Sequence, residues 1–143
     1  MKSSASFPPS GLPSSLRFED IECVETVTLY EMRWSYTENK QVSRIEKTTR
    51  QKGKDPVTDV QIFLYDEAGR LWEYQRQKLR VRYLRNQDGH VTSIERELPH
   101  DGKIIRERIV FTNDRHGNWI RAEMTSPRWN TVIERRLTYY ESE

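Results

Sequence analysis

Apolar and polar residues alternate through the final third of the chain. Ile105 and Ile109 are separated by polar neighbours such as Arg106, and the same period returns at residues 120–124 and 133–139. A period of two is typical of a β-strand with one covered face and one exposed face. No stretch of the chain has a convincing helical period, so the pattern predicts an all-β fold.

Earlier segments give further candidate strands. Residues 22–36 alternate over most of their length, and residues 41–50 are polar enough for an edge strand. Residues 57–65 are apolar on both faces, which predicts the best-buried strand. Residues 70–85 form either one long strand or two strands with a turn near residues 75–78.

Turn signatures separate these candidate strands. Four of them run from a turn-favouring first residue to a glycine, and we expect a type I turn with a left-handed glycine at each. They are residues 66–69, 86–89, 99–102 and 114–117, with weaker copies at 37–40, 50–53 and 127–130. Such short connections pair consecutive strands in order. The sequence therefore predicts an antiparallel β-meander of about eight strands in an open twisted sheet, with a small up-and-down barrel as the alternative.

Composition limits how thick this fold can be. The 143 residues are 34% apolar and 32% charged, with a mean hydropathy of −0.93. This favours a sheet with a thin core over a two-layer sandwich. The length predicts one domain, which we place at residues 21–143, after a flexible Ser/Pro-rich arm at residues 1–20.

Charge, cysteine content and hydropathy bound the function. The net charge of +2 does not by itself indicate a nucleic-acid-binding protein, and Cys23 alone cannot form an internal disulfide. No apolar run is long enough to span a bilayer, and residues 1–16 lack the apolar middle of a secretory signal. We expect a cytoplasmic protein without membrane contact, with export by a specialised secretion system as the alternative.

Two segments carry a family resemblance. Residues 65–71 (Tyr-Asp-Glu-Ala-Gly-Arg-Leu) resemble the YD repeat of Rhs-family proteins, and residues 113–119 are similar to its Asp-x-x-Gly-Asn variant. The resemblance covers roughly residues 57–140. The same segment also resembles MORN-like antitoxin repeats. In the Rhs family such repeats build β-hairpin shells that wrap a cargo domain or bind partners. The resemblance implies a bacterial Rhs-associated or antitoxin/immunity-like accessory protein.

The sharpest candidate for a binding surface is the segment at residues 71–83. In a single continuous strand, one face would carry two aromatic residues and then a row of cations: Trp72, Tyr74, Arg76, Lys78, Arg80 and Arg82. Such a face could stack bases and neutralise phosphates. Alternatively, its cations form a ladder with glutamates of neighbouring strands, namely Glu95, Glu97, Glu107 and Glu134. A turn near Gln77 would break the row.

Catalytic and metal-binding signatures are weak. His90 and His116 are expected at the same end of the sheet, about 10 Å apart, as polar turn residues rather than metal ligands. Glutamates near arginines favour ion pairing over acid–base chemistry. We expect no enzyme activity, no metal and no cofactor.

Trp129, at a predicted turn tip, suits either a partner contact or packing over the last hairpin.

These patterns together predict a non-enzymatic protein-binding module that docks through a sheet face. The expected binding residues are Trp72, Tyr74, Arg76, Arg80, Arg82 and Trp129. The expected partner is another protein, such as a toxin or a secretion component, with a homo-oligomer through a sheet edge or face as the alternative. One alternative is binding of single-stranded nucleic acid or another polyanion by the strand from Trp72 to Arg82. The other is a barrel that binds a hydrophobic ligand.

Overall fold

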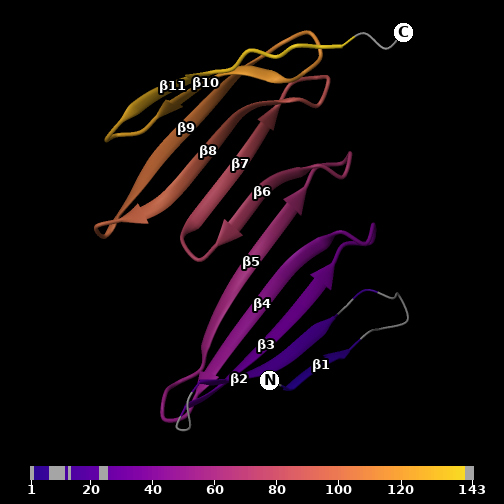
Figure 1. Cartoon of the computed structure of the whole chain (residues 1–143), viewed down its shortest axis with the longest axis vertical. Coiled ribbons are helices and arrows are strands. Elements are labelled where there is room, and N and C mark those ends of the chain that lie inside the picture. Colours follow the sequence, from indigo (N-terminus) through magenta and orange to yellow (C-terminus); the bar gives the residue numbers. More distant parts are fainter. Residues whose placement is uncertain (1, 7–11, 13, 23–25, 141–143) are drawn as a thin grey trace. The chain divides into compact units, whose positions relative to one another are not determined.

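The computed structural model of the chain describes residues 2–6, 12, 14–22 and 26–140, all of which lie in strands, turns or irregular segments. The strands are drawn in Figure 1 and are β1 (Lys2–Ser6), β2 (Ser15–Glu22), β3 (Thr26–Tyr36), β4 (Val42–Gln51), β5 (Val57–Tyr65), β6 (Leu71–Arg76), β7 (Leu79–Arg85), β8 (Val91–His100), β9 (Lys103–Asn113), β10 (Trp119–Thr125) and β11 (Asn130–Glu134).

Strand order in the sheet follows strand order in the chain, from β1 to β11. The registered pairs are antiparallel, for example β3 with β4 and β8 with β9. The predicted all-β antiparallel meander with an open sheet is therefore confirmed. The alternative of a closed up-and-down barrel is wrong, and the ligand-binding hypothesis that required a closed barrel loses its basis.

The strand count exceeds the predicted eight for two reasons. First, β1 and most of β2 lie within the predicted arm at residues 1–20, and the predicted domain boundary at residue 21 falls inside β2. Second, residues 70–85 form two strands, because Gln77 adopts a left-handed φ of 53° and reverses the chain between β6 and β7. Cys23 lies outside the described residues.

The chain divides into two compact units. The first comprises Met1–Arg70 and Tyr74–Gln77, and the second comprises Leu71–Glu73 and Lys78–Glu143. Each unit carries its own side-chain contacts, and the candidate site described below lies wholly in the second.

The turn after β5 shows how the Tyr-Asp-x-x-Gly motif acts locally. Gly69 has a φ of 74°, and its N–H donates to the carbonyl of Asp66 at 2.9 Å. The Asp66 carboxylate accepts hydrogen bonds from the backbone and side chain of Arg70 at 2.8 and 2.9 Å, and the backbone bond is the main reason why its pKa is lowered. The Tyr65 hydroxyl donates to the Val42 carbonyl at 2.8 Å. The motif residues therefore build a hairpin.

The same turn geometry recurs along the chain. Hydrogen bonds of this type close the turns at residues 86–90 and 114–118, where Gly89 and Gly117 have positive φ. In the weaker copy at residues 37–41, Lys40 occupies the glycine position with a φ of 60°. These turn predictions are confirmed.

The predicted turn at residues 99–102 has a different form. Pro99 and His100 belong to β8, and His100 pairs with Lys103. The turn consists of Asp101 and Gly102 alone, with φ values of 47° and 73°. Two consecutive positive φ values are those of a type I′ hairpin, which an Asp-Gly pair favours. The prediction of a four-residue type I turn here is wrong.

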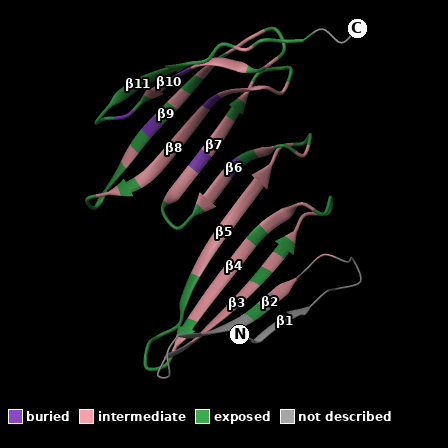
Figure 2. Cartoon of the chain, viewed as in Figure 1, coloured by how far each residue is buried: buried purple, intermediate pink, exposed green. Residues whose placement is uncertain are grey.

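Burial is low on both faces of the sheet. Among the described residues, the buried apolar side chains are Val81 and Ala122, and most strand positions are half-buried (Figure 2). The buried polar residues are Glu73, Ser93, Glu107 and Ser126. No described residue of β5 is buried, so its prediction as the best-buried strand is wrong. Two-sided apolarity did not produce burial because no described layer covers the sheet.

The C-terminal segment folds back onto the turn between β9 and β10. The Arg135 guanidinium lies 3.9 Å from the centre of the Trp119 ring. The Tyr139 hydroxyl donates to the Asp114 carboxylate and accepts a hydrogen bond from Asn118 at 2.9 Å. The alternation expected to continue through residues 133–139 therefore forms a strand only as far as Glu134.

The contact between Tyr139 and Asp114 should depend on pH. The hydrogen bond between the two side chains lowers the pKa of the Asp114 carboxyl and raises the pKa of the Tyr139 phenol from their ordinary values. The stabilisation is present when the carboxylate is ionised and the phenol is neutral. It is lost as the pH falls through the lowered pKa of Asp114, or rises through the raised pKa of Tyr139. Tyr139→Phe should therefore lower the melting temperature at pH 7 and have progressively less effect as the solution is acidified.

Thermal melts between pH 2.5 and pH 7 measure this difference. Tyr140→Phe is the matched control, because the Tyr140 side chain is 94% exposed. An equal loss for Tyr139→Phe at both ends of the pH range would contradict the assignment.

Candidate functional site

Arginines and glutamates alternate across β7, β8 and β9 on one face of the second unit. Residues that pair directly in antiparallel strands share a face. Arg80 pairs with Glu97 and Arg82 with Glu95 between β7 and β8, and the same glutamates pair with arginines of β9. We call this surface the Arg/Glu face, and its residues are Arg80, Arg82, Glu95, Glu97, Arg106 and Arg108.

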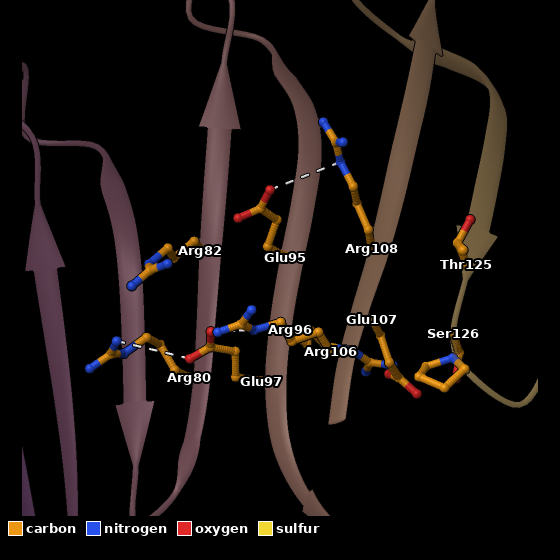
Figure 3. Close-up of a pocket in the computed structure, with 11 residues that line it drawn as sticks. Arg80, Arg82, Glu95, Arg96, Glu97, Arg106, Glu107, Arg108, Thr125 and Ser126 are labelled. Atoms are coloured by element: carbon orange, nitrogen blue, oxygen red, sulfur yellow. Dashed lines mark hydrogen bonds and ion pairs between the residues drawn. The ribbon is translucent and has the colours of Figure 1, made fainter. Parts of the chain in front are cut away.

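Ion pairs cross this face in both directions from β8. Glu97 lies 3.9 Å from Arg80 and 3.1 Å from Arg106. Glu95 lies 4.0 Å from Arg108, and Figure 3 marks this contact and the one between Arg80 and Glu97. Because Glu95 reaches Arg108 only at the outer limit of an ion pair, Arg108 is weakly neutralised.

A buried glutamate of β6 holds the arginines of β7. The Glu73 side chain is 5% exposed and lies 2.8 Å from Arg82 Nε and 3.4 Å from Arg80 Nε. The hydrogen bond from Arg82 to Glu73 raises the pKa of Arg82. The buried carboxylate of Glu73 therefore holds the side chains of Arg80 and Arg82 in place.

The arginines of β9 are more accessible. Their side chains are 82% exposed at Arg106 and 60% exposed at Arg108, against 43% and 37% at Arg80 and Arg82. Long-range attraction for an anionic partner should therefore come mainly from β9.

An open pocket of about 680 Å³ borders this surface where β10 ends (Figure 3). Its lining includes five arginines and three glutamates, of which Arg96 and Glu107 belong to the other face. On the Arg/Glu face four arginines then stand against two glutamates, so this side of the pocket is net positive. The lining residues are Arg80, Arg82, Glu95, Arg96, Glu97, Arg106, Glu107, Arg108, Thr125, Ser126 and Pro127.

The opposite face is mainly apolar, with one ion pair in its middle. Arg96 pairs with Glu107 across β8 and β9, and their side chains form an ion pair. Ile94 and Leu98 flank Arg96 on β8, and Ile105 and Ile109 flank Glu107 on β9. Glu107 was expected in a ladder with the arginines of β7, but it points to the other face because it is one residue out of phase with Arg106.

The predicted row from Trp72 to Arg82 does not exist as one surface. Trp72 and Glu73 are consecutive in β6 and so point to opposite faces. Since Glu73 contacts Arg80 and Arg82, Trp72 lies on the other side of the sheet from these arginines. The turn at Gln77 causes this change, because it folds the two halves of the row into a hairpin.

The remaining predicted binding residues are held by other contacts. In the first unit, the Tyr74 hydroxyl lies 3.2 Å from Gln61, and its ring centre lies 5.2 Å from that of Phe63. Arg76 forms an ion pair with Asp59 at 2.8 Å. In the second unit, Trp129 closes the turn after β10, with its side chain 38% exposed.

Sequence reasoning placed Arg80 and Arg82 on one face, as the structure does, but did not single out Arg106, Arg108 and Thr125, which lie beside them. The signal was present, because Arg106 and Arg108 repeat the two-residue spacing of Arg80 and Arg82. Their place beside the pocket depends on where β10 stops, which the alternation pattern did not specify.

Other chemistry is sparse in the described part of the chain. No group of histidine, cysteine, aspartate or glutamate residues there is placed to hold a metal ion. The His90 imidazole lies against Gly117, so close that an alanine Cβ at residue 117 would meet the ring 2.2 Å away. The described residues include no helix with the length and apolarity needed to cross a membrane.

No protein-family model matches this chain, and no curated protein matches it.

Proposed function

We propose that the protein is a non-enzymatic protein-binding module that docks through the Arg/Glu face of its second unit. The observation that carries the proposal is the net positive open pocket beside the accessible side chains of Arg106 and Arg108. Arginine is enriched at the energetic centres of protein interfaces because its planar guanidinium binds carboxylates in defined geometry. The partner would present acidic side chains to this face.

A bacterial Rhs-associated or antitoxin/immunity-like role stays a hypothesis. Its support is the Tyr-Asp-x-x-Gly motif at residues 65–69 and the related turn at residues 114–117. The partner under this hypothesis is a toxin or a component of a secretion system. The cytoplasmic location and self-association through a sheet edge or face likewise stay predictions.

Nucleic-acid binding is the weaker candidate. The row of cations on which it depended is divided by the turn at Gln77, and Arg80 and Arg82 lie beside Glu73. A phosphate backbone would have to compete with carboxylates that already occupy these guanidinium groups. Fluorescence polarisation with a labelled oligothymidine at low salt tests this candidate, and we expect no binding.

Affinity capture from an extract of the native host tests the proposed function. Arg108→Glu should reduce the captured partner at least about tenfold, because it places a like charge against an acidic surface. Lys52→Glu is the matched control, since it makes the same charge change at an exposed position in the turn after β4, in the first unit. Equal capture by both variants and the wild-type protein would overturn docking through this face.

A further inference from the structure

β9 extends beyond the end of its neighbour β10. The last registered pair between these strands joins Arg108 to Thr125, while β9 begins at Lys103. Residues 103–107 of β9 therefore have no strand partner on the side where β10 stops, although on their other side they pair with β8. This leaves a short open edge beside the pocket.

The direction of the backbone groups on this open edge follows from the hairpin of β10 and β11. The Ser126 N–H donates to the Trp129 carbonyl, so the backbone groups of Ser126 point toward β11. Those of Thr125 then point toward β9 and its partner Arg108, because the direction alternates along a strand. By the same alternation along β9, the N–H and C=O groups of Arg106 and Ile104 point to the open side.

Nothing in the described residues occupies these groups. The backbone hydrogen bonds outside the regular ladders involve neither Ile104 nor Arg106. The Ile104 side chain is 52% exposed and shares a face with Arg106, since the two are separated by one residue. The open edge thus combines unpaired backbone groups, an exposed apolar side chain and an accessible cation.

We propose that this open edge binds an extended acidic segment of a partner protein by antiparallel strand addition. Main-chain hydrogen bonds to Ile104 and Arg106 supply register, and side chains of alternate residues supply specificity. A carboxylate opposite Arg106 meets a net positive pocket, and an apolar side chain opposite Ile104 covers its exposed surface. The open edge accommodates about four residues, opposite residues 103–106. This inference rests on the proposed function and names the form of its partner.

A synthetic peptide tests the inference directly. The probe is Glu-Val-Ile-Thr-amide, which places glutamate opposite Arg106 and isoleucine opposite Ile104 in the antiparallel register and ends before the position of Ser126. We expect amide hydrogen exchange, followed by NMR, to slow at Ile104 and Arg106 when the peptide is added. The same peptide with lysine in place of glutamate should bind on the order of tenfold more weakly.

Two variants separate strand addition from a general surface effect. Ile104→Pro removes an outward N–H without removing a bond to β8, whereas Ile104→Val keeps the N–H and an apolar side chain. Loss of the peptide effect in Ile104→Pro and its retention in Ile104→Val would support the inference. Equal binding by both variants, equal binding of the lysine peptide, or no slowing of exchange at millimolar peptide would overturn it.

The capture experiment distinguishes a failure of the strand-addition proposal from a failure of the proposed function. If Arg108→Glu abolishes capture while Ile104→Pro leaves it unchanged, the face binds a partner but strand addition is wrong. If neither variant alters capture, docking through the face is wrong as well. Protection of the same two amides by an oligothymidine would also overturn the choice of an acidic segment.

Discussion

Replacing Glu73 with alanine should lower the free energy of unfolding by about 2–3 kcal/mol. The Glu73 side chain is 5% exposed and is the carboxylate that joins Arg80 to Arg82. Without the Glu73 carboxylate, the positively charged guanidinium groups of Arg80 and Arg82 lie close together with no negative charge between them. Urea denaturation, monitored by circular dichroism, measures this change in the free energy of unfolding.

Glu123→Ala is the matched control for this loss. Glu123 forms an ion pair with Arg121 at 2.9 Å, but its side chain is 54% exposed. An exposed pair of this kind contributes about 0.2–1 kcal/mol. The assignment of Glu73 as the anchor of the Arg/Glu face fails if the two substitutions cost the same.

Glu107→Leu should cost about 2 kcal/mol, whereas the double variant Arg96→Leu/Glu107→Leu should be as stable as the wild type or more stable. The single variant leaves the Arg96 guanidinium without its partner carboxylate on a largely apolar face. The double variant replaces the pair with side chains that match their flanking neighbours Ile94, Leu98, Ile105 and Ile109.

Denaturation midpoints of the two single variants and the double variant form a double-mutant cycle. The expected signature is a coupling energy that offsets most of the cost of Glu107→Leu. A double variant less stable than Glu107→Leu alone would mean that the ion pair stabilises the sheet beyond what apolar contacts can supply.

The alternation pattern predicted much of the second unit. Ile105 and Ile109 lie on the opposite face from Arg106 and Arg108, as a period of two requires. Turn residues specified the hairpins at Gly69, Gly89 and Gly117 because a left-handed φ favours glycine. At residues 77 and 40 the left-handed conformation is adopted by Gln and Lys, so the residue type at these positions predicted the turn less clearly.

The candidate site was only partly predictable. Arg80 and Arg82 were expected to act together, but their partner Glu73 was not singled out, because the turn between them was left open. Trp72 was expected on the same surface and lies on the other side of the sheet, while Tyr74 and Arg76 belong to the first unit. A single reversal of direction determines which face every following residue occupies.

By itself, the sequence determined the all-β antiparallel meander, because a two-residue period and short glycine-ended turns leave few other ways to pair strands. Tertiary structure alone decided which charges meet and where an edge stays open. Ion pairs between β7, β8 and β9 depend on register, and the open edge at Ile104 depends on β10 ending opposite Arg108. Register and strand length are set by cross-strand contacts between distant residues, which the local pattern of one strand does not contain.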